Sequence, residues 1–165
     1  MSNFYTDVVM KDPRFHTTQA VSDIMLLEPV TRAAVQAIMA ESAASGIPLI
    51  AYETYRSQER QMALFQKGVT QLRTVGVHHY GLACDLVKDI GGPSWKGDFT
   101  FLRDLAKAHG LIWGGDWGFP KRPTKFVDAV HVQRCTVARQ TSLFNGDWFP
   151  DDTYNPYADL GAGGQ

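Results

Sequence analysis

Two short apolar segments of this chain each combine histidine with a carboxylate. The first runs from His78 to Asp85 and the second from Asp128 to Gln133. Imidazoles and carboxylates are zinc ligands, and three such groups leave one coordination position of the ion open. A fourth group could then accept a proton from a bound water molecule. The two segments therefore indicate a metal-dependent hydrolase.

The spacing within the first segment supports a metal site. In a strand, Asp85 would share a face with Ala83, whose small side chain leaves room for an ion. Gly81 permits a sharp turn that returns His78 toward Asp85, although His79 competes with His78 as the ligand. Because a buried carboxylate needs a cation, the competing interpretation is a core aspartate paired with arginine. The second cluster makes the metal site the stronger prediction.

In the second segment, Ala129, His131 and Gln133 would share one strand face, with Asp128 at the entrance of the strand. A histidine in an apolar strand is more often a hydrogen-bonded core residue than a ligand. Here it follows a carboxylate by three residues, and a similar cluster exists upstream. Together the two segments predict a metal centre.

Arginine and tryptophan residues nearby supply further candidates for the site. Arg56 follows a predicted buried strand, so its guanidinium could bind a substrate carboxylate or polarise a carbonyl oxygen. A surface arginine paired within a helix fits the sequence equally well. Trp113, Trp117 and Phe119 could line a groove, although aromatic residues more often pack in the core or at its rim.

The apolar spacing predicts the elements that must position these residues. Helices are expected over about 29–45, where Pro suits the first turn, over 57–67 after the capping Ser57, and over 98–109 after the capping Asp98. Strands are expected over 47–55, 82–88 and 126–133. This order predicts an α+β fold with about three helices and a small, mainly antiparallel sheet. We expect a catalytic domain over residues 1–140, with an irregular lead-in over 1–25, and a surface tail over 141–165.

Composition excludes several classes of function. Lys and Arg number 16 against 17 Asp and Glu, and no basic run interleaves with aromatic residues, so a nucleic-acid partner is not expected. No segment is long and apolar enough for membrane insertion, and the N-terminus does not have the pattern of a signal peptide. The two cysteines, Cys84 and Cys135, are expected to be reduced, in a monomer made in the cytoplasm.

The combined motif resembles a known family. It comprises Arg56-Ser57, Gln61, Gly68, His78-x-x-Gly81-x-Ala83-x-Asp85 and Asp128-x-x-His131. This array is similar to the zinc D-Ala-D-Ala carboxypeptidase and L-alanyl-D-glutamate peptidase family (VanY-like), whose fold the Hedgehog signalling domain shares. Residues 110–133 look most like its L-alanyl-D-glutamate endopeptidase branch, which includes many phage endolysins. The resemblance covers about residues 25–135.

The resemblance implies one Zn²⁺ per chain, held by His78, Asp85 and His131, with Asp128 as general base and Arg56 as a substrate or transition-state anchor. It further implies substrate contacts from Gln61, Tyr80, Trp113 and Trp117. One departure is Gly76, where the family usually has a serine that supports the first ligand through a hydrogen bond. Another is that the base is Asp instead of the Glu common in the carboxypeptidase branch.

The activity expected from this resemblance is hydrolysis of the L-alanyl-D-glutamate bond in the stem peptide of peptidoglycan. The expected setting is an endolysin that reaches the cell wall through a holin, or an exported effector with an immunity protein. Alternatives are a D-Ala-D-Ala carboxypeptidase of the same family, a non-catalytic zinc-binding module of the same fold, and a structural phage tail component.

Overall fold

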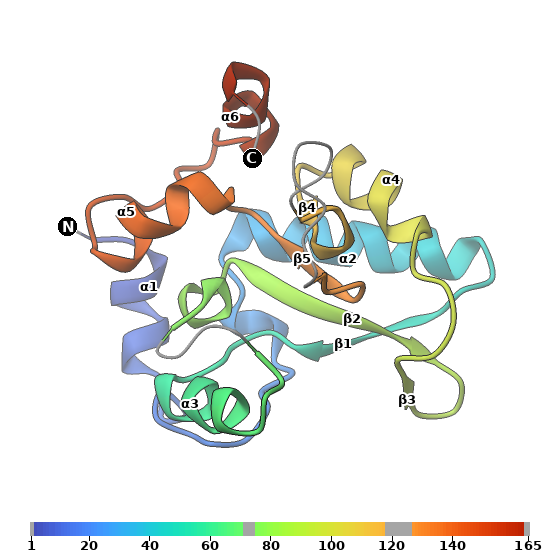
Figure 1. The fold of residues 1–165 in the computed structure, drawn as a ribbon, viewed down its shortest axis with the longest axis horizontal. Coiled ribbons are helices and arrows are strands. Elements are labelled where there is room, and N and C mark those ends of the chain that lie inside the picture. Colours follow the sequence, from blue (N-terminus) through green and yellow to red (C-terminus); the bar gives the residue numbers. More distant parts are fainter. Residues whose placement is uncertain (1, 71–74, 118–126, 164–165) are drawn as a thin grey trace.

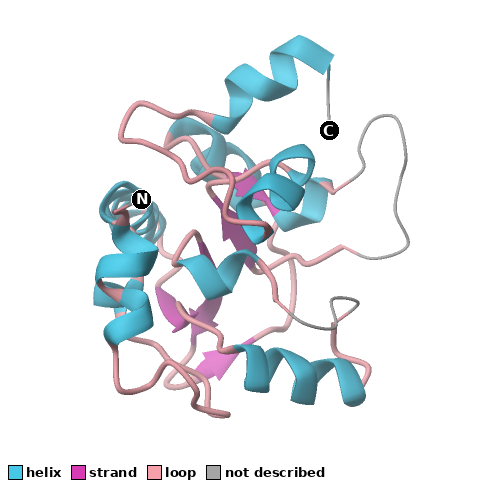
Figure 2. Cartoon of the chain, turned by 90° about the vertical axis from the view of Figure 1, so that its left-hand side faces the viewer, coloured by secondary structure: helices cyan, strands magenta, loops and turns pink. Residues whose placement is uncertain are grey.

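The computed structural model describes residues 2–70, 75–117 and 127–163. Its centre is an antiparallel sheet in the order β1 (Leu49–Glu53), β2 (Ala83–Asp89), β5 (His131–Gln133) and β4 (Ile112–Trp113), and the short β3 (Pro93–Ser94) also pairs with β2. The strands lie in the middle of the molecule, with helices around them (Figures 1 and 2). The predicted α+β class with a mainly antiparallel sheet is confirmed.

Two of the three predicted helices form the main core with the sheet. In α2 (Pro29–Ala44), the Glu28 carboxylate accepts from the Val30 and Thr31 backbone N–H groups, and Val35 and Ile38 are fully buried. α4 (Phe101–Ala108) buries Leu102 and Ala106 in the same apolar cluster. The predicted cap of α4 was wrong, because Asp98 accepts from Thr100 and the helix begins at Phe101.

The third predicted helix, α3 (Gln58–Gln66), follows β1 and lies apart from α2 and α4 in Figure 1. Its first turn is capped by Ser57, whose hydroxyl accepts from the Arg60 backbone N–H at 2.9 Å. The 3₁₀ helices are η1 (Val9–Lys11), η2 (Ile24–Leu26), η3 (Val77–Tyr80), η4 (Gly114–Asp116) and η5 (Val137–Arg139). No helix within the described residues combines the length and the apolar character needed to cross a bilayer.

The ends of the chain form short helices that the sequence did not predict. These are α1 (Phe4–Asp7) in the predicted lead-in, and α5 (Gln140–Phe144) and α6 (Pro156–Gly163) in the predicted tail. α5 spans the predicted domain boundary at residue 140, and its Leu143 is buried in one apolar cluster with Leu82 and Cys135. α1 and α5 lie side by side, with Tyr5 and Phe144 packed against that same cluster (Figure 1).

A buried ion pair attaches the C-terminal segment to the core. Arg134, which follows β5, is 1% exposed and donates from Nη1 to the Glu28 carboxylate at 3.2 Å. Its Nη2 donates to the carbonyl oxygens of Asp151 and Tyr154 at 2.6 and 2.9 Å. One guanidinium therefore joins the start of α2, the end of β5 and residues 151–154.

We predict that Arg134→Leu lowers the free energy of unfolding by about 3 kcal/mol, because removing one partner leaves the buried Glu28 carboxylate without its cation. Urea unfolding followed by circular dichroism measures the change. Arg103→Leu serves as the matched control, since the Arg103 side chain is 51% exposed in its pair with Asp116 and such pairs contribute about 1 kcal/mol or less. Equal losses in the two variants would contradict the prediction.

Candidate metal centre

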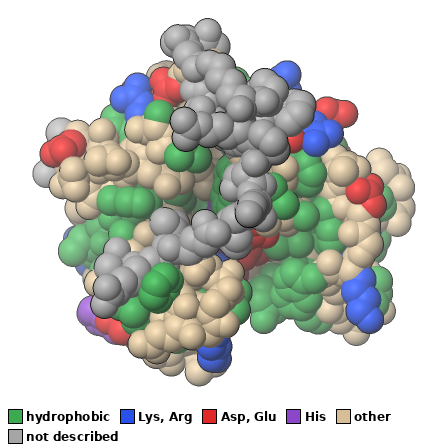
Figure 3. All heavy atoms as spheres, in the orientation of Figure 1, with side chains coloured by type: hydrophobic (Ala, Val, Ile, Leu, Met, Phe, Trp, Pro, Cys, Tyr) green, Lys and Arg blue, Asp and Glu red, His purple; other side chains and the backbone are tan. Residues whose placement is uncertain are grey.

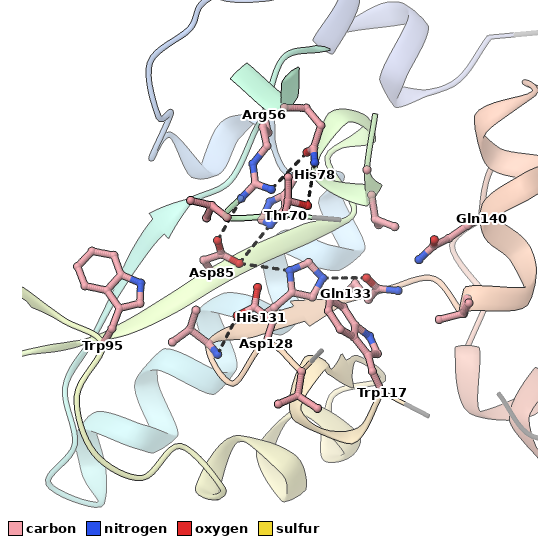
Figure 4. A pocket seen from close by; sticks show the side chains of 17 residues that line it. Arg56, Thr70, His78, Asp85, Trp95, Trp117, Asp128, His131, Gln133 and Gln140 are labelled. Carbon is pink, nitrogen blue, oxygen red and sulfur yellow. Dashed lines mark hydrogen bonds and ion pairs between the residues drawn. The ribbon is translucent and has the colours of Figure 1, made fainter. Parts of the chain in front are cut away.

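Three buried side chains from three elements meet at one point. His78 comes from η3, Asp85 from β2 and His131 from β5. His78 Nε2 and His131 Nδ1 lie 3.1 and 3.2 Å from the same carboxylate oxygen, Asp85 Oδ1 (Figure 4). Of the described residues, these three form the group of His, Cys, Asp and Glu side chains that could hold a metal ion, with all ligand atoms within 4.8 Å of one another.

Sheet register explains why these residues converge. Asp85 lies directly opposite His131 in the β2–β5 pair, and opposite Glu53 in the β1–β2 pair. Residues directly opposite each other on antiparallel strands project to the same face, within contact distance. Glu53, Asp85 and His131 therefore form a row across three strands. This row holds the His131 imidazole against the Asp85 carboxylate.

Gly81 brings His78 to this row. Its φ of 73° lies in the left-handed region, and a Cβ at this position would approach the Leu26 carbonyl oxygen to 2.6 Å. A side chain would therefore be strained in both conformation and space. The turn predicted at Gly81 is present, and it connects η3 to β2 so that the His78 ring faces Asp85.

Electrostatics favour the protonation states that metal binding requires at His78 and Asp85, but not at His131. Burial lowers the pKa of His78, which keeps its imidazole neutral near pH 7. Burial alone would raise the pKa of Asp85, but the adjacent His78 and His131 hold it well below its ordinary value. Burial opposes the charged form of His131, yet the contact with Asp85 raises its pKa, so a bound ion would displace a proton there.

The donor set fits a zinc ion. Two imidazoles and one carboxylate form a common catalytic zinc set that leaves one position open. His78 Nδ1 is buried without a hydrogen-bond partner among the described residues, so Nε2 is the nitrogen directed at the cluster. This unpartnered nitrogen agrees with the predicted loss of a supporting hydrogen bond at Gly76, which lines the same cavity.

His79 has a different position from its neighbour. Its ring nitrogens lie 2.9 Å from the Tyr5 hydroxyl and 3.2 Å from the Arg56 carbonyl oxygen. The rings of Phe15 and Tyr55 also pack around it. The structure thus brings His78, and not its competitor His79, to Asp85.

Arg56 enters the site as predicted, and it is held there by several groups. It donates from Nε to Glu53 at 2.7 Å and from Nη1 to the Gln61 amide oxygen at 3.3 Å, while Nη2 lies 3.4 Å from Asp85 Oδ2. Glu53 also pairs with Arg60. Gln61 lines the cavity but is 1% exposed, so its contact with the guanidinium suits a positioning role.

Asp128 lies in the turn before β5 and not in a strand as predicted. β5 begins at His131, and residue 126, the predicted start of the strand, lies outside the described residues. The His131 backbone N–H donates to the Asp128 carbonyl oxygen at 3.3 Å, which places both side chains at the cavity. Burial raises the pKa of the Asp128 carboxyl above its ordinary value. A carboxylate of raised basicity beside a metal cluster is suited to accept a proton.

The sequence did not indicate that the site needs a glycine at position 114, because Gly114-Gly115 is also typical of an ordinary break between secondary-structure elements. A Cβ on Gly114 would lie 2.5 Å from the Asp128 carbonyl oxygen and 3.1 Å from the His131 Cβ. The Gly114 carbonyl oxygen also accepts from the Asp128 N–H at 3.2 Å. The absence of a side chain at Gly114 therefore allows the turn carrying Asp128 to pack closely.

A cavity of about 580 Å³ opens over the cluster. In Figure 3, acidic atoms are visible in a hollow bordered by hydrophobic side chains. Trp95 lies on one side of the cluster and Gln140 on the opposite side (Figure 4). Trp117 packs its ring 5.0 Å from that of His131, which agrees with its predicted place in a groove. Trp95 and Gln133 line the cavity without having been predicted.

Two predicted substrate contacts lie away from this cavity. Tyr80 is buried on the other side of η3, with its ring 4.6 Å from Tyr5 and 5.8 Å from Phe144. Trp113 is buried in β4, and its indole N–H donates to the Ala129 carbonyl oxygen at 2.7 Å. The prediction that these two residues contact the substrate was wrong, because long-range packing places both side chains away from the cavity and no local sequence pattern reveals that packing. Phe119 lies outside the described residues.

Both cysteines are free and buried, and neither belongs to the metal cluster. Burial raises the pKa of the Cys84 thiol well above its ordinary value, and that of Cys135 to about 12. Thiols in this state are poor ligands and poor nucleophiles.

Sequence comparison finds two named peptidases among the relatives of this chain. The peptidoglycan L-alanyl-D-glutamate endopeptidase CwlK of Bacillus subtilis is 28% identical over 142 residues, which cover 72% of this chain and 81% of that protein. The L-alanyl-D-glutamate peptidase of a Listeria phage is 28% identical over 151 residues, or 88% of this chain, but the match spans only 51% of the phage protein. No family model matches the chain.

Solved structures share the fold. The Serratia marcescens L-Ala D-Glu endopeptidase ChiX superposes with a TM-score of 0.53 at 22% identity, over 71% of this chain and 90% of that one. The vancomycin resistance D,D-pentapeptidase VanY, solved in complex with Zn(II), gives 0.50 at 18% identity, over 72% and 78%. The resemblance predicted from the motif is therefore confirmed: the chain is similar in sequence to two L-alanyl-D-glutamate peptidases, and it shares the fold of ChiX and of the zinc-bound VanY.

Proposed function

We propose that this chain is a zinc-dependent peptidoglycan peptidase that hydrolyses the L-alanyl-D-glutamate bond of the stem peptide. The observation that carries the proposal is the buried His78–Asp85–His131 cluster, which opens into a cavity beside Asp128 and Arg56. The two relatives named for cleavage of this bond support the choice of substrate.

His78, Asp85 and His131 would hold one zinc ion per chain. When bound, zinc supplies a Lewis acid that polarises the scissile carbonyl and lowers the pKa of water to roughly 7. A non-catalytic zinc module would need only these three side chains. The additional presence of Asp128 and of the fixed Arg56 at the same cavity supports an enzyme.

Asp128 acts as the general base in this proposal. Its carboxylate takes the proton of the attacking water and then passes it to the leaving amine. Arg56 stabilises the negative charge that develops on the carbonyl oxygen. Glu53, Gln61 and Asp85 already hold the guanidinium in place, so it does not have to reorient during the reaction.

The shape and charge of the cavity support an endopeptidase over a carboxypeptidase. The cavity extends past the cluster in both directions, toward Trp95 and toward Gln140, so a chain could continue on either side (Figure 4). A carboxypeptidase needs a cation that clamps a terminal carboxylate. Among the described residues of the cavity, Arg56 is the one arginine or lysine. In this proposal it faces the developing oxyanion, so the described residues offer no second cation for a terminal carboxylate.

The biological setting forms part of the proposal. The phage relative supports an endolysin that acts on the cell wall. Release through a holin, or control of an exported effector by an immunity protein, would bring the chain to that substrate. We propose that it acts there as a monomer.

We predict that the purified protein binds about one zinc ion per chain, and that His78→Ala loses both the metal and the activity. The reason is that two remaining protein ligands hold zinc poorly. Metal analysis after gel filtration measures the stoichiometry. His16→Ala is the matched control, because its side chain is 75% exposed and pairs with Glu59, and it should retain zinc. Full zinc content in a folded His78→Ala protein would contradict the ligand assignment.

Asp128→Asn should retain zinc and the fold while lowering kcat by a factor of about 10² to 10⁴, the usual contribution of a general base. Asparagine keeps the shape of the side chain but is a far weaker base. The same exchange at Asp116, which pairs with Arg103, should leave kcat within about twofold of the wild type. Turnover near the wild-type rate in Asp128→Asn would remove this residue from the mechanism, and loss of zinc would make it a ligand.

The bond that is cut can be identified from the products. Incubation of the zinc-loaded protein with purified sacculi should release stem peptides that begin with D-glutamate or D-isoglutamine, detected by mass spectrometry of the muropeptides. Release of free D-alanine alone would establish the D-Ala-D-Ala carboxypeptidase instead. If metal-loaded protein releases neither product, the non-catalytic zinc module becomes the better interpretation.

A further inference from the structure

Gln133 is a buried polar residue next to the metal cluster for which the proposed mechanism gives no role. It is 1% exposed and lies two residues after His131, so both side chains project from the same face of β5. The Gln133 backbone is fixed from both sides, since it pairs with Ala83 on β2 and with Ile112 on β4.

The two ends of the Gln133 amide have different partners. Nε2 donates to the Cys135 carbonyl oxygen, and Oε1 lies 2.8 Å from His131 Nε2. The amide NH₂ group only donates, whereas its oxygen only accepts. The reversed amide would place two oxygens against each other at Cys135, so the Cys135 carbonyl dictates that the Gln133 oxygen faces His131.

This orientation has a consequence for His131. Because the Gln133 oxygen only accepts, His131 Nε2 must carry a proton, and Nδ1 is the nitrogen directed at the cluster, 3.2 Å from Asp85 Oδ1. We propose that Gln133 is a positioning residue that fixes the tautomer and ring orientation of His131, so that Nδ1 is presented to the metal ion. This inference rests on the zinc site of the proposed function.

The cluster depends on Gln133 because the other histidine lacks an equivalent partner. His78 Nδ1 is buried with no hydrogen-bond partner among the described residues, and Gly76 has no side chain to offer one. Hydrogen bonds to the distal nitrogen of a ligating histidine typically change metal affinity 10- to 100-fold. Gln133 supplies this supporting hydrogen bond at His131, whereas His78 has none among the described residues.

A direct contact with the substrate is the competing role, since Gln133 lines the cavity. Its amide is nevertheless used at both ends by groups of the protein, His131 and Cys135. Support of the metal ligand and contact with substrate predict different measurements, because only the first changes zinc binding in the absence of substrate.

The test compares zinc affinities by competition with a chromophoric chelator, without substrate. Gln133→Leu should raise the Kd for zinc about 10- to 100-fold. Gln133→Glu keeps an acceptor facing His131 but sets an oxygen against the Cys135 carbonyl, so it should recover only part of that loss. Gln140→Leu is the matched control: it makes the same chemical change in the wall of the same cavity, no interaction joins Gln140 to the three metal-site residues in Figure 4, and it should leave the Kd unchanged.

Nitrogen-15 NMR of the zinc-bound wild-type protein, labelled at histidine, provides a readout that does not depend on any variant folding. His131 should show a protonated Nε2 and a metal-bound Nδ1. The opposite assignment would overturn the proposal, as would an unchanged Kd in Gln133→Leu accompanied only by a raised KM. Neither measurement uses peptidase activity, so an inactive protein that meets both expectations would refute the proposed function and leave the role of Gln133 standing.

Discussion

The buried carboxylate of Asp85 is the constraint on which the rest of the site depends. An ionised carboxylate in the interior is stable only when cations or hydrogen-bond donors surround it. Here they come from three directions, with His78 before β2, His131 from β5 and Arg56 after β1. Each contact needs a particular register or turn. The sheet order, the left-handed Gly81 and the exit from β1 are therefore conditions for one charge to be stable inside this protein.

The same arrangement separates the roles of the carboxylates. Asp85 and Glu53 share Arg56, and Glu53 has Arg60 in addition, so both have cations in contact. Asp128 is half-buried in the same cavity, and no cation pairs with it among the ion pairs of the described residues. Burial accordingly raises the pKa of Asp128, while the histidines lower that of Asp85. The two carboxylates of this cavity therefore differ in pKa in the direction that the proposed roles need, with Asp85 as a ligand and Asp128 as a base.

The sequence was informative where function depends on local geometry. The two clusters of histidine and carboxylate predicted a metal centre that includes Asp85 and His131, with His78 and His79 as competing ligands, and the family motif implied His78. The sequence was uninformative where long-range packing decides. Which side of η3 carries Tyr80 depends on contacts with Tyr5 and Phe144, and these residues are distant in the chain.

Composition at the C-terminus, with its Asn, Asp, Pro and Gly, predicted a surface tail but not how that tail is attached. The carbonyl oxygens of Asp151 and Tyr154 accept from the buried Arg134, an interaction that the side-chain sequence does not reveal. Trp113 illustrates the same point at the site itself. It misses the cavity, yet its indole holds the Ala129 carbonyl in the turn between Asp128 and His131, and the adjacent Gly114 lets that turn pack closely. Trp113 of β4 and Gly114 of η4 therefore act on the turn that carries Asp128, the proposed base, through its backbone. A motif of side chains that touch the substrate would not include them.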